Sequence, residues 1–242
     1  MKNLSTKTVR EIALELPVTT KVFEEYKIDY CCGGRILFSE ACQKVGADPT
    51  AVLEKIDKIL ANDSDQELDW LKIAQLGELA DYIEEKHHAF TKYELENLPP
   101  LMEKVARVHG ERHPELMELK EQFQALCEDL EPHLQKEELI LFPYIRQLDP
   151  TYPIQKDLSL PCFGSVQNPI RMMMMEHETV GDLLGNMRAT TKDFSLPEGA
   201  CPSYTALFVR LEAFEFDLHQ HIHLENNLLF PKAIDLEDSK LN

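Results

Sequence analysis

The sequence predicts an all-α protein in which a four-helix bundle follows a small helical domain. Apolar residues recur at helical spacing along most of the chain after residue 70. The motif His-x-x-x-Glu with a following Leu-Phe-Pro occurs twice, at 133–143 and 221–231, and the copies lie 88 residues apart (221 − 133). A histidine precedes each copy by a similar interval, His88 by 45 residues and His177 by 44. The later part of the chain is therefore predicted to contain two copies of a helix pair, which together make four helices.

Residues 1–62 are predicted to form a small domain of short helices. Thr6 or Thr8 can cap the first helix, and Pro17 ends it. The adjacent Gly33-Gly34 predicts a turn. The helices are expected at about 8–16, 20–26, 36–45 and 49–60.

The polar, acidic stretch 63–69 predicts a linker, so the bundle should occupy residues 70–242. Pro99-Pro100 should kink or break the first bundle helix, and Pro132 should kink the second. A long irregular connection should follow the second helix, and a frayed tail should follow Ile234. The four helices are expected at about 71–108, 114–147, 169–191 and 202–234.

The repeated motif places metal-binding side chains on one face of a helix. Positions i and i+4 lie one turn apart, so His133 and Glu137 point in the same direction, and His221 and Glu225 repeat this arrangement. Burial of such a glutamate without a partner would cost on the order of several kcal/mol, and a metal ion would supply that partner. A buried His-Glu hydrogen-bond network without metal is the rival interpretation. With the two partner histidines, the candidate ligands are His88, His133, Glu137, His177, His221 and Glu225.

The kind of ligand indicates the kind of metal. Imidazoles and carboxylates without thiolates are typical of di-iron or di-manganese centres inside helix bundles. Six protein ligands exceed what one tetrahedral ion accepts. We therefore expect two ions bridged by Glu137 and Glu225, with coordination positions left open. An open position on ferrous iron can bind a small molecule such as O2 or NO.

Other polar residues near the motif are expected to have different roles. The matched intervals favour His88 over His87 as a ligand. His109 should lie at the hairpin end of the bundle, far from the site. His219 and His223 should face away from the site, because they are offset by two positions from a ligand.

Three glutamates adjoin the candidate ligands and should either support them or be solvated, namely Glu138, Glu176 and Glu178. The run Met172–Met175 should belong to the core and not form a metal-binding tract, because four consecutive residues cannot all face one point on a helix.

Cys31 and Cys32 precede a predicted helix N-terminus and lie beside Arg35. Positive potential there would lower the pKa of a thiol, so two exposed thiolates would be able to bind a metal or exchange disulfides. The alternative is that one cysteine packs inward and the pair has no chemical role. The chain has six cysteines, and a reducing cytosol would keep them as thiols.

Composition excludes several classes of partner. The chain has 242 residues, and Asp and Glu outnumber Lys and Arg by 43 to 25, which gives a net charge of −18. Such a charge would repel nucleic acid and anionic membranes over most of the surface. No apolar run has the length of a signal peptide core or of a membrane span. We therefore expect a soluble cytoplasmic protein with neither nucleic acid nor membrane as a main partner.

Several stretches of the sequence resemble one known family. They are Asp-Tyr-Cys-Cys-Gly-Gly at 29–34, Val-Ala-Arg-Val-His at 105–109, Asn-Pro-Ile with Glu-His at 168–177, and the motif at 221–231. This combination resembles the Repair of Iron Centres (RIC) proteins, in which a hemerythrin-like domain follows a small double-cysteine domain. The resemblance implies two non-haem iron ions, oxo- and carboxylate-bridged, held by the six candidate ligands.

The resemblance also implies a cytoplasmic stress protein that repairs iron-sulfur clusters damaged by nitric oxide or oxidants. The leading hypothesis is that the centre supplies iron to a damaged iron-sulfur protein, with Cys31 and Cys32 assisting transfer or docking. Two alternatives remain open at this point. The centre would reduce NO to nitrous oxide, or it would bind O2 or NO reversibly as a sensor or carrier. A homodimer is compatible with the resemblance.

Overall fold

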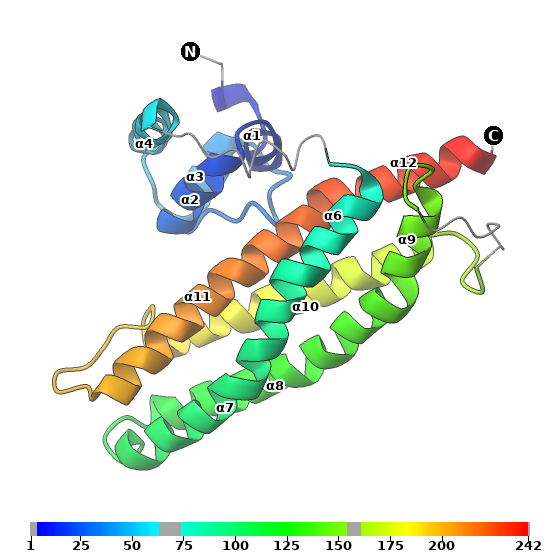
Figure 1. The fold of residues 1–242 in the computed structure, drawn as a ribbon. Helices are drawn as coiled ribbons and strands as arrows, with labels where there is room; N and C mark the ends of the chain where they lie inside the picture. Colours follow the sequence, from blue (N-terminus) through cyan, green and yellow to red (C-terminus); the bar gives the residue numbers. More distant parts are fainter. Residues whose placement is uncertain (1–3, 63–73, 154–160, 242) are drawn as a thin grey trace.

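The computed structural model describes residues 4–62, 74–153 and 161–241. Within these ranges every regular element is a helix, so the predicted all-α class is confirmed. A small N-terminal group of helices lies against one side of a long bundle (Figure 1). The linker predicted at 63–69 lies outside the described residues.

The N-terminal domain consists of short helices around its own apolar core. The Thr8 hydroxyl accepts the N–H of Glu11 at 3.2 Å, and the Glu11 carboxylate accepts the N–H of Thr8 at 2.8 Å, which begins the first helix. Phe23, Phe38 and Ile56 are fully buried at the centre. The helices are α1 (Val9–Glu15), α2 (Thr20–Glu25), α3 (Phe38–Lys44) and α4 (Pro49–Asn62), with 3₁₀ turns at Leu4–Thr6 and Pro17–Thr19.

The bundle has four helical rods, three of which are built from several segments. The first rod comprises α6 (Leu76–Tyr82), a π-helical turn (Ile83–His88) and α7 (Ala89–His109). The second comprises α8 (Glu115–Lys136), a π-helical turn (Glu137–Leu141) and α9 (Phe142–Leu148). The third is α10 (Gln167–Thr191), and the fourth comprises α11 (Pro202–Leu224), a π-helical turn (Glu225–Leu229) and α12 (Phe230–Leu241). Because α7 packs against α8 and α11, and α8 packs against α10, the rods enclose a common interior (Figure 1).

Each of the three π-helical turns carries a candidate metal ligand at one end. His88 ends the first turn, Glu137 begins the second, and Glu225 begins the third. In the second and fourth rods a proline follows the turn, Pro143 and Pro231 respectively. Proline has no N–H for the carbonyl four residues earlier, which favours a wider turn at that point, and such turns are frequent at functional sites.

The prolines inside the rods do not break them, so the break considered at Pro99-Pro100 does not occur. α7 continues through Pro99 and Pro100, and α8 continues through Pro132. All three prolines are exposed, so water can reach the carbonyls that lose their partners. The opposite face of α7 is anchored by buried Leu98 and Met102, and this packing outweighs the lost hydrogen bonds.

The frayed tail expected after Ile234 is also wrong, because α12 continues to Leu241. Glu237 is buried in this segment and accepts hydrogen bonds from the Tyr144 hydroxyl at 2.7 Å and the Ser165 hydroxyl at 2.6 Å. The backbone N–H of Val166 donates to the same carboxylate at 3.0 Å. The last helix is therefore tied to the second rod and to the connection before α10.

The candidate ligands lie in a polar layer between two apolar clusters of the bundle. One cluster fills the end where α7 turns into α8, and it includes Leu98, Phe123, Leu184 and Phe214. The other fills the opposite end and includes Leu79, Phe142, Ile170 and Phe230. On every rod the candidate ligands lie between residues of the first cluster and residues of the second, so the polar layer is closed off from both ends of the bundle.

The two domains meet through the segment that carries the fourth rod's π-helical turn. The Asn227 side chain donates to the carbonyl oxygens of Tyr30 at 3.2 Å and Cys31 at 3.4 Å. The Asn227 carbonyl, which loses its helical partner at Pro231, accepts from Arg10 at 3.4 Å. The double-cysteine turn is thus docked directly onto the rod that carries two candidate ligands.

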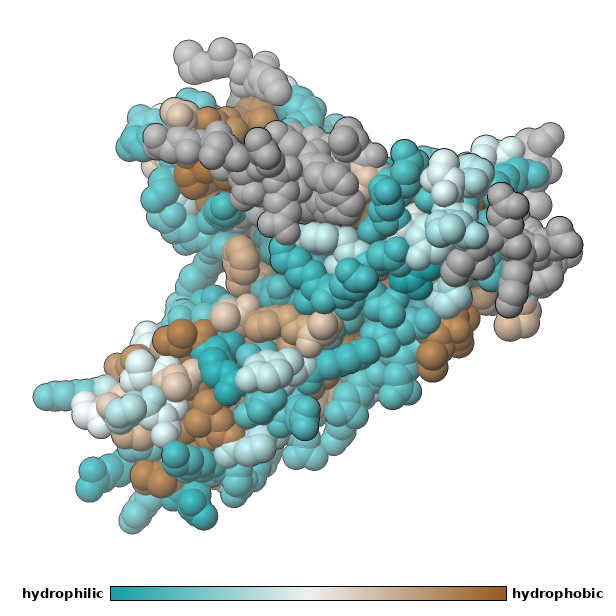
Figure 2. Space-filling view, in the orientation of Figure 1, coloured by the Kyte–Doolittle hydropathy of each residue, from teal (hydrophilic) through white to brown (hydrophobic). Residues whose placement is uncertain are grey.

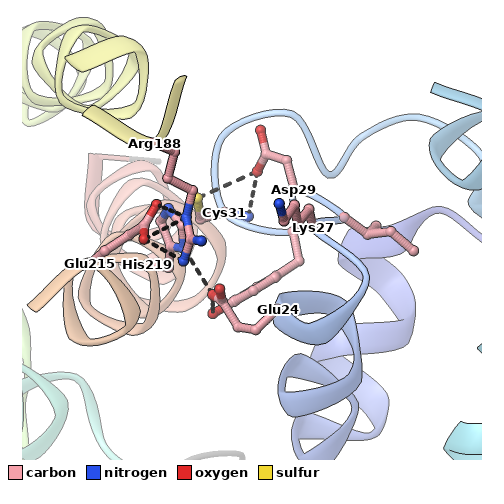
Figure 3. A pocket seen from close by; sticks show the side chains of 9 residues that line it. Glu24, Lys27, Asp29, Cys31, Arg188, Glu215 and His219 are labelled. Carbon is pink, nitrogen blue, oxygen red and sulfur yellow. Dashed lines mark hydrogen bonds and ion pairs between the residues drawn. The ribbon is translucent and has the colours of Figure 1, made fainter. Parts of the chain in front are cut away.

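A second part of the junction encloses a cavity of about 130 Å³ (Figure 3). Glu24 reaches from the small domain to His219, with 2.8 Å between Oε1 and Nδ1. On the bundle side Arg188 donates from Nε to both oxygens of Glu215, at 2.8 and 2.7 Å. Two ion pairs, Glu24 with His219 and Arg188 with Glu215, therefore lie in the wall of the cavity, beside Cys31.

In the described part of the chain, no helix is long and apolar enough to cross a membrane. The face in Figure 2 is largely hydrophilic, with apolar side chains gathered mainly toward the end of the bundle where α7 and α8 meet.

Candidate metal centre

All six candidate ligands converge in the polar layer. His133 lies in the last turn of α8, His221 lies near the end of α11, and His177 lies in the middle of α10. His88, Glu137 and Glu225 belong to the π-helical turns. None of the six side-chain residues is more than 1% exposed. Their convergence follows from the antiparallel packing of two helix pairs, each of which contributes the same residue types.

The ligand atoms form two quartets. In the first, Nε2 of His88 and Nε2 of His221 lie 3.0 Å apart. In the second, Nε2 of His133 and Nε2 of His177 lie 3.2 Å apart. The quartets are His88, Glu137, His221, Glu225 and His133, Glu137, His177, Glu225, and within each quartet the ligand atoms lie within 4.8 Å of one another. Because both glutamates belong to both quartets, the geometry suits two ions with carboxylates between them.

The alternative of a hydrogen-bonded network without metal leaves buried oxygens without partners. Oε1 and Oε2 of Glu137 and Oε2 of Glu225 are buried and accept no hydrogen bond from the described residues. Oε2 of Glu137 lies 3.4 Å from Nε2 of His88 and 3.3 Å from Nε2 of His133, but these contacts lack hydrogen-bond alignment. Buried carboxylate oxygens are costly unless they are satisfied, and a cation would satisfy all of them. The residues therefore fit a metal better than they fit one another.

The protonation of the site supports this fit. Burial lowers the pKa of His88 and His133, but the Glu137 and Glu225 carboxylates outweigh it and raise both pKa values to about 10. For His221 burial prevails and lowers the pKa. Burial raises the pKa of Glu137, but the neighbouring imidazoles outweigh it and lower that pKa. In the metal-free chain the protons on His88 and His133 therefore supply positive charge beside the buried carboxylates. A bound metal must displace these protons.

Two glutamates orient the imidazoles through the nitrogen that faces away from the centre. Nδ1 of His88 lies 2.9 Å from Oε1 of Glu138. Nδ1 of His133 lies 2.8 Å from Oε2 of Glu176, which also pairs with Lys136. Such bonds fix the ring orientation and make the imidazole a stronger ligand. Of the two roles left open for Glu138 and Glu176, support of a ligand or exposure to solvent, the structure shows support.

The third outer contact was missed by sequence reasoning. Nδ1 of His177 lies 2.9 Å from Oδ1 of Asn226. The repeat contained a usable signal, because Asn226 follows Glu225 as Glu138 follows Glu137. Glu178, the remaining candidate, is exposed and has no contact with the site.

The other histidines lie outside both quartets. His87 directs Nδ1 to Oδ1 of Asp217 at 3.0 Å, which agrees with the preference for His88. His109 lies at the hairpin end, with Nε2 at 3.1 Å from the thiol of Cys201. His223 faces the small domain, where its Nδ1 lies near the Tyr30 carbonyl at 3.4 Å.

The methionine run was predicted only in part. Met173 is 2% exposed and packs in the core, but Met172 and Met175 are about half exposed, at 51% and 58%. One helix face cannot bury all four residues, so the run spreads over both the core and the surface.

Comparison with known proteins identifies this arrangement. Residues 78–233 match the family model of the hemerythrin HHE cation binding domain, and residues 5–60 match the ScdA N-terminal domain, described as a domain of unknown function. The iron-sulfur cluster repair protein YtfE of Yersinia pestis (strain Pestoides F) is 34% identical over 223 residues, which cover 92% of this chain and 94% of that protein. The chain belongs to the RIC family. The YtfE protein of Yersinia pseudotuberculosis serotype IB (strain PB1/+) matches with the same identity and coverage. In this RIC-family chain the His and Glu cluster is a non-haem iron site.

The cysteines of this RIC-family chain differ from the prediction of two exposed thiolates. Cys31 is only 8% exposed, and the Cys32 thiol, burial and Asp29 all raise its pKa well above the ordinary value. The Asp29 carboxylate lies within the turn, where it accepts the N–H groups of Cys31, Cys32 and Gly33 at 3.0, 3.0 and 2.8 Å. Its negative charge disfavours the thiolate form of Cys31. Cys32 is half-buried, and its thiol lies 3.7 Å from the carbonyl oxygen of His177. Cys31 therefore packs inward, which was one part of the alternative expectation.

A surface cavity of about 140 Å³ lies between α8 and α10. Lys136 and Glu176 line it, and His133 is the one candidate ligand among its lining residues.

Proposed function

We propose that this chain holds two non-haem iron ions, oxo- and carboxylate-bridged, and repairs damaged iron-sulfur clusters by supplying iron. The observation that carries the proposal is the pair of buried quartets that share Glu137 and Glu225. Relatives over nearly the whole chain are named iron-sulfur cluster repair proteins, which agrees with it. The proposed ligands are His88, His133, Glu137, His177, His221 and Glu225.

The chemistry of the ligands suits a metal that is held and then given away. Neutral imidazoles and two carboxylates supply only two negative charges for two divalent ions, and no thiolate is among the ligands. Ferrous iron lies low in the affinity order of divalent metals, and the thiolates of an iron-sulfur protein are strong competitors for it. A damaged cluster site with vacant cysteines would therefore draw iron from this centre.

The expected setting of this function is the cytoplasm under nitrosative or oxidative stress. The partners would be damaged iron-sulfur proteins, with NO or O2 as small ligands. The thiols of Cys31 and Cys32 lie at the domain junction, and of the two only Cys32 is partly accessible, so Cys32 is the better placed to assist transfer or docking. All six cysteines are free, which agrees with a reducing compartment.

The decisive experiment is iron transfer with a ligand variant. Glu137→Leu should fold, because the buried carboxylate has no hydrogen bond to lose, but it should not retain the iron pair. The anaerobically loaded protein, with isotopically labelled iron, is mixed with an iron-sulfur enzyme inactivated by NO, and both restored activity and transferred label are measured.

The matched control is Glu178→Leu, which changes an exposed glutamate beside His177 and should repair normally. Repair by Glu137→Leu equal to that of the unchanged protein would refute the proposal. Nitrous oxide production over several turnovers with all iron retained would instead support the alternative of NO reduction.

A further inference from the structure

The two halves of the centre are not equivalent outside the ligand shell. The internal repeat relates each ligand to a counterpart 88 or 89 residues later, and the same relation applies to the neighbours of the ligands. Three of these neighbours, Glu138, Glu176 and Asn226, orient a ligand imidazole, whereas His87 does not. The related pairs are His133 with His221, Glu137 with Glu225, His88 with His177, Glu138 with Asn226, and His87 with Glu176.

On the His133 side both imidazoles are anchored. Glu176 holds Nδ1 of His133 at 2.8 Å, and Asn226 holds Nδ1 of His177 at 2.9 Å. Each ring is therefore fixed with Nε2 toward the interior, and His133 gains ligand strength from a carboxylate. Lys136 pairs with Glu176 and keeps that carboxylate in place.

On the other side only one imidazole is anchored. Glu138 holds Nδ1 of His88 at 2.9 Å, but Nδ1 of His221 is buried and has no hydrogen-bond partner in the described ranges. In the repeat, His87 occupies the position that corresponds to Glu176 in the other copy. The His87 ring stacks on the His221 ring, with centroids 5.9 Å apart and planes 14° apart, and stacked rings do not hydrogen-bond to each other.

Asp217 lies one helical turn before His221 on α11, and one of its carboxylate oxygens is engaged by His87. Its Oδ1 lies 3.0 Å from Nδ1 of His87, and its Oδ2 is buried without a hydrogen bond. His87 therefore leaves His221 without an anchor in two ways. It stands at the position that corresponds to Glu176, and it binds an oxygen of the Asp217 carboxylate.

We propose that the ion bound by His88 and His221 is the more weakly held of the two and is released first, because His87 leaves His221 without an anchor. This inference rests on the proposed function as a two-iron donor and specifies which iron is delivered. His87 is a positioning residue in this scheme, since it touches a ligand and not the metal. The ion on the better anchored His133 side stays behind after the first release.

The test follows iron loss from the anaerobic diferrous protein to an excess of a coloured ferrous chelator. The unchanged chain should lose iron in two phases, each of one equivalent. His87→Glu introduces the carboxylate that the other half has, so it should slow the fast phase by about tenfold and leave the slow phase unchanged. Glu176→Gln removes the corresponding carboxylate and should accelerate only the slow phase.

Spectroscopy of the half-depleted protein gives a second measurement. The remaining iron should show the signature of an isolated high-spin ferrous ion, and the same species should form when the metal-free chain receives one equivalent. His87→Gln, which offers a neutral acceptor of similar reach, should slow the fast phase less than His87→Glu does, and it decides the matter if the glutamate variant does not fold.

Loss of both ions in one phase, or an equal effect of the position-87 variants on both phases, would overturn the inference. Neither result would contradict the proposed function, provided that the chain still restores a damaged cluster. Two-phase release from a chain that restores no cluster would support the order of release and refute the proposed function.

Discussion

The iron site and the Cys31-Cys32 turn lie close together, but they differ in whether their carboxylate oxygens are hydrogen-bonded. In the site, both carboxylate oxygens of Glu137 are buried without a hydrogen bond. In the turn, the carboxylate of Asp29 accepts three backbone N–H groups and a thiol, so its polar contacts are made within the chain itself. Unsatisfied ligand atoms indicate a place for something absent from the polypeptide, whereas a satisfied turn indicates a structural joint between domains.

The largest expected contrast is in metal content. Glu225→Gln removes a charge shared by both quartets, so the iron content should fall from about two per chain to less than one. Cys32→Ser should keep the full content, because the Cys32 thiol contacts the His177 backbone carbonyl and the Cys31 side chain and not a candidate ligand atom. Metal analysis of the two anaerobically purified variants measures this. A loss of iron in Cys32→Ser would mean that the turn belongs to the site after all.

The next contrast is in the effect of pH. The pKa values of His88 and His133 are raised to about 10 in the metal-free chain, so both are protonated near neutral pH and their protons compete with iron. Iron affinity should therefore rise between about pH 6.5 and about pH 8.5, with about two protons released as the site fills. Calorimetry in buffers of different ionisation enthalpy measures the release, and an affinity independent of pH would contradict this reading of the site.

The raised pKa values of His88 and His133 predict that the stability of the metal-free chain falls as the pH rises, whereas iron affinity increases. A histidine whose pKa is raised on folding stabilises the folded state below its unfolded value of about 6.5, and this contribution is lost as pH rises through about 10. The free energy of unfolding of the metal-free chain should decrease over that window, as thermal or urea unfolding can show. The iron-loaded protein should lack this decrease, since its imidazoles carry no competing proton.

A smaller effect is expected from the outer contact of His177. Asn226→Ala removes the acceptor at 2.9 Å from Nδ1 and should weaken iron binding by about tenfold without preventing it. Asn226→Asp restores an acceptor and adds charge, so it should bind at least as tightly as the unchanged chain. Competition with a chelator measures both, and equal binding by all three proteins would show that this contact is only structural.

The smallest effect is expected in the turn. The Cys32 thiol, burial and the Asp29 carboxylate all raise the pKa of Cys31. Asp29→Asn removes one of these causes, so Cys31 should be alkylated a few times faster by iodoacetamide, with no change in iron content. Peptide mapping after timed labelling measures the rate, and Cys127, whose pKa burial raises to about 12, provides an internal reference.

The candidate ligands could be found in the sequence because helix periodicity relates i to i+4 without any knowledge of the fold. His133 with Glu137, and its repeated copy, depend on that relation alone. Asn226 was harder to find because an amide has many uses in a helix, and only the partner ring shows which one applies here. The break considered at Pro99-Pro100 does not occur, because buried neighbours on the same helix decide the outcome there and a local rule does not include them.

The sequence by itself determined the all-α class, the doubled helix pair and the six residues that meet in the bundle, since these follow from short-range periodicity and from a repeat. The tertiary structure alone decided the state of the thiols, because Cys31 is shielded by residues from both domains and its turn is held by Asn227. It also decided that the two quartets differ in their outer contacts. That difference depends on His87 stacking against His221 across two helices, and the direction of a side chain toward another helix is set by packing and not by spacing.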